Sequence, residues 1–259
     1  MLIRPEQLAA LQQAALSRFE TEMVEYFRGF APKLFQIAGE PGIRAVVRLG
    51  MDRAEKYRFT NRGPVRFYLE LMFSLGTDFD TDPLLPWAAK ALKDADPDQT
   101  SRARRLFEEL NNYLDQVPGP GNWNLLEALR KVGRVGPEQF AVPAGDSFPG
   151  RGLRVLYEIY PQKCRHAGRT PMEALIDGAV SCAADHGLAG PAGAGALAEL
   201  MLFFGYGAPR DPLYPWVGKT LDDPNLSHPN LRAEKLFSRT RTYFEHMLAH
   251  LSERGANAE

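Results

Sequence analysis

The sequence predicts a mainly α-helical protein of two pseudo-symmetric helical halves, produced by an internal duplication and packed together. The first observation is a repeat: residues 70–87 read ELMFSLGTDFDTDPLLPW, and residues 199–216 read ELMLFFGYGAPRDPLYPW. The second is that apolar residues recur every three or four positions through most segments, as they do on one face of a helix. The third is that no segment keeps the apolar–polar alternation of a half-buried strand.

The repeat extends well beyond these two stretches. An offset of 129 positions relates Trp87 to Trp216, and it also pairs Glu70 with Glu199, Gly76 with Gly205, Asp82 with Asp211 and Pro86 with Pro215. After one inserted residue, Arg102, Leu106 and Tyr113 align with Arg232, Leu236 and Tyr243. Tryptophan, proline and glycine are scarce or structurally demanding, so coincidence explains these matches poorly. The period is far longer than the roughly 20–50 residues of a solenoid repeat, which indicates two domain-sized halves.

The expected division is an N-terminal helical half over residues 1–117, a linker with a short helix over 118–147, and a C-terminal helical half over 148–259. The repeats themselves cover about 19–117 and 148–246. The clearest linker signal is the run VPGPG at residues 117–121, because proline and glycine interrupt regular structure.

Helices in the first half are predicted from the spacing of apolar residues and from the prolines and glycines that begin or end helices. A long amphipathic helix is expected over residues 5–28, with Pro5 in its first turn and a break at Gly29 and Pro32. Others are expected from Pro41, over 64–75, from Asp82 as a helix cap with Pro83 in the first turn, and over 99–116.

The second half repeats this order. After a short helix over residues 123–132, helices are expected around 153–157 and over 171–185, 192–204, 211–221 and 230–251, followed by a frayed tail over 252–259. The segments 64–75 and 192–204 are apolar on nearly all sides, which indicates buried helices.

Composition narrows the class of protein. The chain has 259 residues, 44% of them apolar and 24% charged, with a net charge of −1, which is ordinary for a globular protein and gives no bulk attraction to nucleic acid or to an anionic membrane. The N-terminal residues lack the apolar core of a signal peptide, and no apolar run reaches the length of a membrane span. Two cysteines, Cys164 and Cys182, cannot form a disulfide scaffold. A cytoplasmic protein with no membrane and no nucleic-acid partner is therefore expected; its oligomeric state is left open.

Glu70 and Glu199 interrupt the most apolar helix of each half, and a buried carboxylate must be neutral or paired. One interpretation is a pair of catalytic acids or metal ligands; the other, favoured because no histidine recurs beside the pair, is a structural carboxylate. Arg66 lies one turn before Glu70 and is a candidate partner. The equivalent position in the second half is Gly195, so Glu199 needs a different partner.

Other polar patterns carry weaker signals. The aspartates at 78, 80 and 82 begin like a calcium loop, but the glycine and glutamate that such a loop requires are missing. Cys182 with His186, and His246 with His250, lie one helical turn apart, but zinc needs three or four converging ligands. The glycine-rich run over 187–195 lacks the ending of a phosphate loop. No catalytic residue, no metal and no cofactor is therefore predicted.

Trp87 and Trp216 each follow a proline near the start of a helix. They either fill the core of their half or, if exposed, form two equivalent anchors for a protein partner.

The run KYRFTNRGPVRFYLELMFSLGTDFDTDPLLPW, residues 56–87, resembles a pattern in accessory proteins encoded beside the spike proteins and toxic effectors of type VI secretion systems. This resemblance implies a cytoplasmic helper: an adaptor or chaperone that loads an effector, or an immunity protein that blocks one. The second copy departs from the pattern at residues 187–196, where the aromatic and arginine residues are absent.

The resulting prediction is a non-catalytic protein-binding helper, with an effector or spike protein as its partner. Polar residues that flank the repeated helix are expected to make the contact: Arg58, Asn61, Arg62, Arg66, Asp78 and Asp80. Two alternatives remain open, an immunity protein that inhibits a cognate toxin and an enzyme that uses Glu70 and Glu199 in a cleft between the halves.

Overall fold

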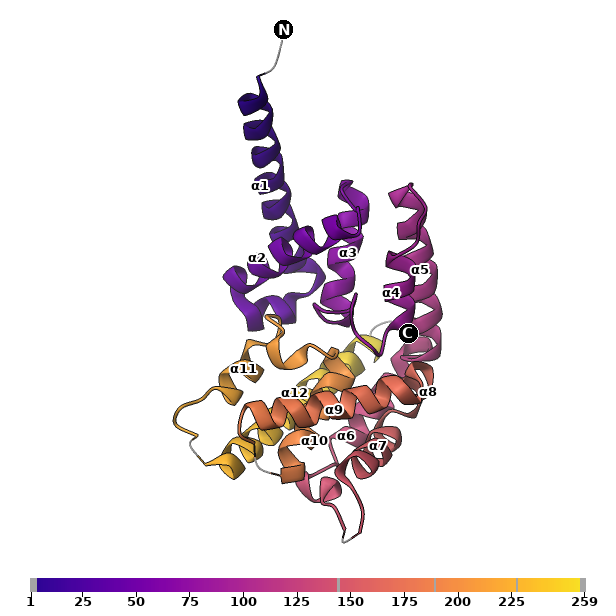
Figure 1. The fold of residues 1–259 in the computed structure, drawn as a ribbon, viewed down its shortest axis with the longest axis vertical. Coiled ribbons are helices and arrows are strands. Elements are labelled where there is room, and N and C mark those ends of the chain that lie inside the picture. Colours follow the sequence, from indigo (N-terminus) through magenta and orange to yellow (C-terminus); the bar gives the residue numbers. More distant parts are fainter. Residues whose placement is uncertain (1–3, 144, 189, 227, 257–259) are drawn as a thin grey trace.

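The computed structural model describes residues 4–143, 145–188, 190–226 and 228–256, and these residues are helical nearly throughout (Figure 1). The predicted mainly α class is confirmed: the described residues form α-helices and short 3₁₀ helices and contain no strand. The first helices are α1 (Pro5–Phe30), α2 (Pro32–Lys56), α3 (Arg62–Leu75), α4 (Pro86–Leu92) and α5 (Gln99–Gln116). The rest are η1 (Pro120–Asn122), α6 (Trp123–Val132), η2 (Pro137–Phe140), α7 (Phe148–Ile159), α8 (Pro161–Ala167), α9 (Arg169–Asp185), α10 (Gly190–Phe204), η3 (Ala208–Arg210), α11 (Pro215–Leu221) and α12 (Pro229–Ala256).

The helices form two groups. Figure 1 shows α1 to α5 in the upper part of the molecule and α6 to α12 in the lower part. In the upper group α1 packs on α2, α2 on α3, and α3 and α4 on α5; in the lower group α10 is surrounded by α7, α9 and α12. None of the described helices combines the length and the apolar character that crossing a membrane requires.

Helix α10 is the centre of the lower group because nearly every side of it is apolar. The glycines that precede its apolar run serve packing: a Cβ on Gly195 would lie 2.5 Å from the ring of Phe140, and a Cβ on Gly193 would lie 2.6 Å from Leu188. The glycine-rich run therefore lets neighbouring side chains approach the helix backbone closely, which agrees with the sequence argument against a phosphate loop.

Several helix boundaries differ from the predictions. Asp82 and Asp211 do not cap helices: α4 begins at Pro86 and α11 at Pro215, and the residues between form turns. Helix α2 begins at Pro32, and the break predicted before Pro41 is a kink at Gly39, where φ is 68°. Helix α12 continues to Ala256, past the expected start of a frayed tail, and residues 257–259 lie outside the described residues.

The segment predicted as a linker is packed against the lower group. Helix α6 has the predicted bounds, and it contacts α7 and α12. Leu129, Val132 and Phe140 are fully buried there. The segment is thus part of the hydrophobic core as well as a connection along the chain.

The two groups meet where the loop after α3 faces the loop after α10. The backbone N–H of Thr77 donates to Oδ2 of Asp211, and the backbone N–H of Tyr206 donates to Oδ2 of Asp82, both at 2.9 Å. Each aspartate uses its other oxygen to accept from the N–H two residues later, at 2.8 Å. These carboxylates therefore tie each turn to itself and to the turn of the other group, which explains why they do not begin helices.

Glycine is required on both sides of this junction. Gly76 has a φ of 104° and Gly205 a φ of 98°, values that side-chain-bearing residues rarely adopt. A Cβ on Gly76 would also lie 2.4 Å from the carbonyl oxygen of Phe204. The positive φ lets the chain leave each helix sharply, and the missing side chain lets the two loops touch.

Candidate protein-binding site

The projecting part of α1 carries exposed apolar side chains. One face of this helix carries Leu8, Leu11, Phe19, Met23 and Phe27, spaced three, four or eight positions apart. Met23 and Phe27 are buried against the body, whereas Leu8 and Leu11 are 49% and 60% exposed. Figure 1 shows why: the N-terminal turns of α1 extend beyond every other helix. The core-facing stripe therefore continues into solvent.

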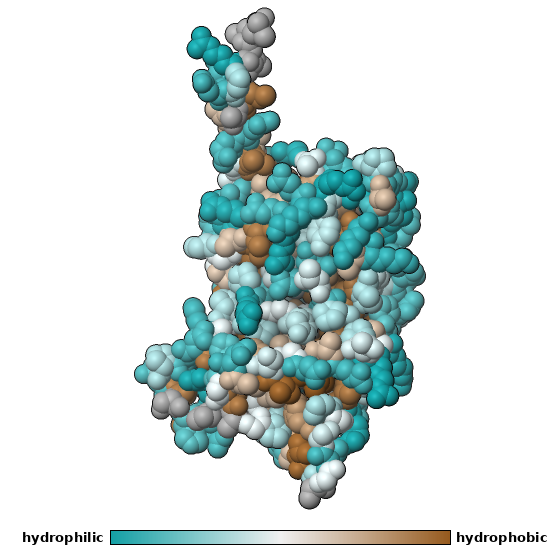
Figure 2. All heavy atoms as spheres, in the orientation of Figure 1, coloured by the Kyte–Doolittle hydropathy of each residue, from teal (hydrophilic) through white to brown (hydrophobic). Residues whose placement is uncertain are grey.

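An apolar hollow lies at the base of this projection. It encloses about 610 Å³ between α1, the end of α2 and the start of α3. Its wall combines apolar side chains with polar ones at the edge: Gln12, Ala15, Leu16, Phe19, Met51, Asp52, Glu55, Phe59, Thr60, Arg62 and Val65. Leu16, on the α1 side of the hollow, is 52% exposed. In Figure 2, apolar spheres recur along the projecting helix among hydrophilic ones.

Ion pairs fix the direction of α1. Glu20 accepts from Arg48 at 2.9 Å and from Arg44 at 2.8 Å, and the hydrogen bond from Arg48 is the main reason that the pKa of Glu20 is lowered. From α3, Arg62 pairs with Glu22, and its guanidinium lies 5.0 Å from the centre of the Phe19 ring. These contacts hold the lower part of α1 to α2 and α3, and they thereby set the orientation of the exposed stripe.

Arg66 belongs to the same set of contacts. Its Nε donates to Glu70 at 2.9 Å, as the sequence predicted, and its guanidinium lies 4.0 Å from the centre of the Tyr26 ring. The hydroxyl of Tyr26 donates to the same oxygen of Glu70 at 2.8 Å. Glu70 is thus half-buried at the α1–α3 contact, where it joins the two helices.

Arg58 and Asn61 lie in the turn between α2 and α3. Arg58 is exposed and has a φ of 58°, the left-handed region that a non-glycine residue seldom adopts. Asn61 precedes α3, and its backbone N–H donates to Gln99 at 2.9 Å. The buried Arg102 donates to the carbonyl oxygens of Tyr57 and Arg58. This turn is therefore held rigidly from α5.

Asp78 and Asp80 lie at the opposite end of α3, away from the hollow that Arg62 borders. Arg53 pairs with Asp78 at 2.6 Å, lies 3.5 Å from Asp80, and donates to the carbonyl oxygen of Thr77. Asp80 is only 5% exposed, so it is not the surface contact that the sequence predicted. Its buried carboxylate lies beside the guanidinium of Arg53 instead of facing solvent.

Glu199 has a different environment from Glu70. It is fully buried, and both of its oxygens accept from Nη2 of Arg241, at 2.9 and 2.7 Å. Burial raises the pKa of Glu199 to about 8, and the charge and hydrogen bonds of Arg241 act in the opposite direction. The partner that the sequence left open is thus an arginine from α12. Glu70 and Glu199 have separate partners on separate pairs of helices, so nothing in their contacts unites them in one site.

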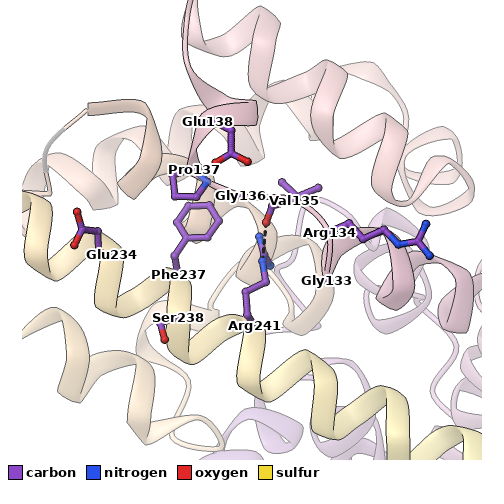
Figure 3. A pocket seen from close by; sticks show the side chains of 10 residues that line it. All are labelled: Gly133, Arg134, Val135, Gly136, Pro137, Glu138, Glu234, Phe237, Ser238 and Arg241. Carbon is purple, nitrogen blue, oxygen red and sulfur yellow. Dashed lines mark hydrogen bonds between the residues drawn. The ribbon is translucent and has the colours of Figure 1, made fainter.

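A shallow hollow of about 410 Å³ lies above Arg241, bordered by the turn before η2 and by α12 (Figure 3). The Nε of Arg241 donates to the carbonyl oxygen of Val135 at 2.8 Å, drawn as the dashed line, and its guanidinium lies 5.0 Å from the ring centre of Phe237. Among the described residues, its buried Nη1 has no hydrogen-bond partner. Because two nitrogens of Arg241 already serve Glu199 and Val135, this residue joins α12 to α10 and to the turn.

The remaining candidates stay apart from one another. Cys164 and Cys182 are buried free thiols whose pKa values burial raises, to about 12 for Cys164. His186 contacts Asp222, and within the described residues no three potential metal ligands gather. Trp87 and Trp216 are half-buried and pack on Tyr113 and Tyr243, with ring centres 5.7 and 5.6 Å apart. They contribute to packing in their groups of helices.

Reading the sequence missed the exposed stripe on α1. Its periodicity predicted the helix, but a repeating apolar face does not reveal whether anything covers it. The available signal was a helix with apolar residues close to its N-terminal end. Comparisons with protein-family models, with curated proteins and with solved structures find no match to this chain.

Proposed function

We propose that this chain is a non-catalytic protein-binding helper, built from two copies of one helical unit, that holds a segment of a partner protein on the α1 surface. The α1 surface consists of Leu8, Leu11, Leu16 and the hollow beside them. The observation that carries the proposal is the continuation of the core-facing stripe of α1 into solvent, because such apolar surfaces mark interaction sites. An amphipathic helix of the partner, laid along this groove, would bury these side chains.

The duplicated origin of the chain is supported by contacts that recur at the repeat offset. The two hydrogen bonds of the junction are made by equivalent residues of the two repeats. Their donors, Thr77 and Tyr206, are 129 positions apart, and their acceptors, Asp82 and Asp211, are separated by the same offset. Each turn thus binds the other in the same way, as expected of halves related by a pseudo-twofold axis.

A second pair of contacts supports the same origin. Arg102 donates to the carbonyl oxygen of Tyr57, at the end of α2, and Arg232 donates to that of His186, at the end of α9. The acceptors are 129 positions apart, and the donors are 130 apart, as the inserted residue requires. After two copies had fused, one copy would be free to diverge. The second copy has diverged in this way, because it lacks the basic and aromatic residues that the first copy carries beside α3.

The buried carboxyl groups favour binding over catalysis, because their contacts give them structural roles. Asp82 and Asp211 accept backbone N–H groups across the junction, and Glu199 accepts two hydrogen bonds from Arg241. An enzyme that uses Glu70 and Glu199 together would need them in one cleft, and no contact favours that arrangement. The proposal therefore treats them as parts of the scaffold.

The resemblance of residues 56–87 supplies the proposed setting: a cytoplasmic adaptor or chaperone whose partner is a type VI effector or spike protein. An immunity protein is the alternative role for the same surface. The two roles differ in their effect on the toxin, since an adaptor leaves its activity intact and an immunity protein abolishes it. Measuring the activity of the effector with and without equimolar chain decides between them.

The test is co-purification of the tagged chain with the effector or spike protein encoded beside its gene. Leu11→Asp places a charge on the stripe and is expected to abolish capture, whereas Leu231→Asp, at a 53% exposed leucine of α12, should leave it intact. Arg62→Ala should weaken capture, because it loosens α1 and alters the edge of the hollow. Failure to capture either neighbour, or equal capture by the two leucine variants, would refute the proposal.

A further inference from the structure

We infer that, when no partner is bound, the α1 surface is occupied by the α1 helix of a second copy of this chain, in an antiparallel homodimer. The dimer is inferred from α1 alone. Its consequence, that the partner protein and the second copy compete for the α1 surface, rests on the proposed function. The same helix supplies both an apolar rod and, at its base, the hollow that would receive it.

The spacing along α1 is self-complementary. Turned antiparallel about a twofold axis between Gln13 and Ala14, two copies of α1 place Leu8 of one opposite Phe19 of the other, at the wall of the hollow. Gln12 then lies opposite Ala15. Leu11 and Leu16 lie at the same level on the two flanks of the contact, so all three exposed leucines of each copy are covered. Residues 8–19 span roughly 17 Å at a rise of about 1.5 Å per residue, which is about three helical turns.

Charges on the flank of the stripe fit the same register. Arg4 directly precedes the first residue of α1, and Glu22 lies 18 positions later, on the lower part of the helix. In the antiparallel register Arg4 of one copy lies level with Met23 of the other, one residue from Glu22, so a basic and an acidic side chain come near each other at both ends of the contact. Arg4 is exposed, and the side chain of Glu22 remains 40% exposed while it pairs with Arg62. A parallel arrangement would instead place like charges together.

The shape of the molecule permits this arrangement. The N-terminal turns of α1 extend beyond α2, α3 and α5 (Figure 1). In the antiparallel dimer the body of each copy would therefore sit at the free end of the other copy's helix. Each projection then reaches the hollow of the opposite copy. A partner helix that binds the α1 surface must displace the second copy, so self-association would keep the apolar stripe covered until the partner arrives.

The first measurement is the molar mass of the purified chain without any partner, by light scattering during size-exclusion chromatography. A mass of twice 28.9 kDa at micromolar concentration is expected. Leu8→Asp should weaken self-association about 10-fold to 100-fold, because the dimer covers two half-exposed copies of Leu8, which together correspond to burying about one leucine; Leu231→Asp should not change it. A wild-type monomer at 100-fold higher concentration would overturn the dimer and leave capture of a partner untouched.

The second measurement fixes the register by disulfide cross-linking. Gln12→Cys lies near the axis on the contact face and is expected to form a covalent dimer on mild oxidation. Ala14→Cys lies at the same level of the helix but points away from the contact, so it should not form a covalent dimer. The native cysteines are buried, and the wild-type chain measures the background of cross-linking. A dimer that cross-links equally through both positions, or through neither, would overturn the antiparallel α1 contact.

The third measurement separates this inference from the proposed function. Adding the captured effector or spike protein to the dimer should yield a complex that contains one copy of this chain, because both ligands need the same stripe. A complex that retains the dimer would overturn the competition. A dimer that captures neither neighbour would refute the proposed function and leave the dimer standing.

Discussion

Replacing Glu199 with glutamine should change how the stability of the protein depends on pH. Glu199 is fully buried in α10, and its carboxyl group faces the guanidinium of Arg241. Burial raises its pKa to about 8 from an ordinary value of 4.5, because the attraction of Arg241 only partly offsets the loss of hydration. The folded state therefore holds a proton that the unfolded chain releases between these two values.

The sign and size of the effect follow from linkage. A carboxyl whose pKa is raised on folding stabilises the folded state fully below pH 4.5, and this contribution is lost as the pH rises through about 8. One pKa unit corresponds to about 1.4 kcal/mol, so the wild-type free energy of unfolding should fall by roughly 3.5 kcal/mol, relative to Glu199→Gln, between pH 5 and pH 8. Other titrating groups are present in both proteins and cancel in the difference.

The assay is urea denaturation at intervals from pH 5 to about pH 10, followed by helical circular dichroism. Arg241→Met is the matched control: without its cation, Glu199 should ionise at a still higher pH, so the fall in stability should continue further into the alkaline range. Parallel curves for wild type and Glu199→Gln would refute the reasoning, because they would show a carboxylate that is already ionised at pH 5. In that case Arg241 would outweigh the cost of burial.

Three further predictions concern the junction and the core. Gly76→Ala should lower the free energy of unfolding by about 2 kcal/mol or more, because φ at this position is 104° and the new Cβ would lie 2.4 Å from a carbonyl oxygen. Gly29→Ala, where a Cβ meets open space, should not lower the melting temperature. Equal losses of melting temperature in the two variants would contradict this account. Burial raises the pKa of Asp211 to about 6, so stability should fall as the pH rises from about 4 to 6, and Asp211→Asn should flatten that fall in urea denaturation; an unchanged slope would contradict it. Gly195→Ala should destabilise the protein in urea by crowding Phe140, and adding Phe140→Leu should recover part of the loss; additive losses would show that the two positions do not touch.

Much of the helical framework was predictable because its signals are local. The bounds of α5 and α6 agree with the predictions at both ends, since proline, glycine and polar residues flank clear periodic segments. Asp82 was wrongly expected to cap a helix. An aspartate followed by proline satisfies the local rule, but its carboxylate is used by Tyr206 across the junction. A hydrogen bond between residues 124 positions apart leaves no trace in local sequence.

The candidate site was predicted only in part, for a related reason. Arg62 and Arg66 were predicted to contact a partner, and this stays a prediction; in the structure they pair with Glu22 and Glu70 and so orient α1 more than they offer free charge. Asp80 was expected at the surface because it lies in a polar turn, and it is buried because Arg53 reaches it from α2. Long side chains from other helices decide which polar residues remain available.

The proposed binding depends on the exposed stripe of α1 and on the contacts that orient this helix. Full burial of a leucine is worth roughly 1.5–3 kcal/mol, and the isolated chain leaves about half of that unrealised at each half-exposed leucine of α1. If α1 were free to move, the entropy cost of ordering it on association would offset this free energy, since association already costs several kcal/mol in lost translational and rotational freedom. Glu20, Arg44 and Arg62 remove much of that cost in advance, because they fix α1 to the body before anything binds. A preordered apolar helix would let a small surface support the proposed association, and loosening Arg62 should therefore weaken it.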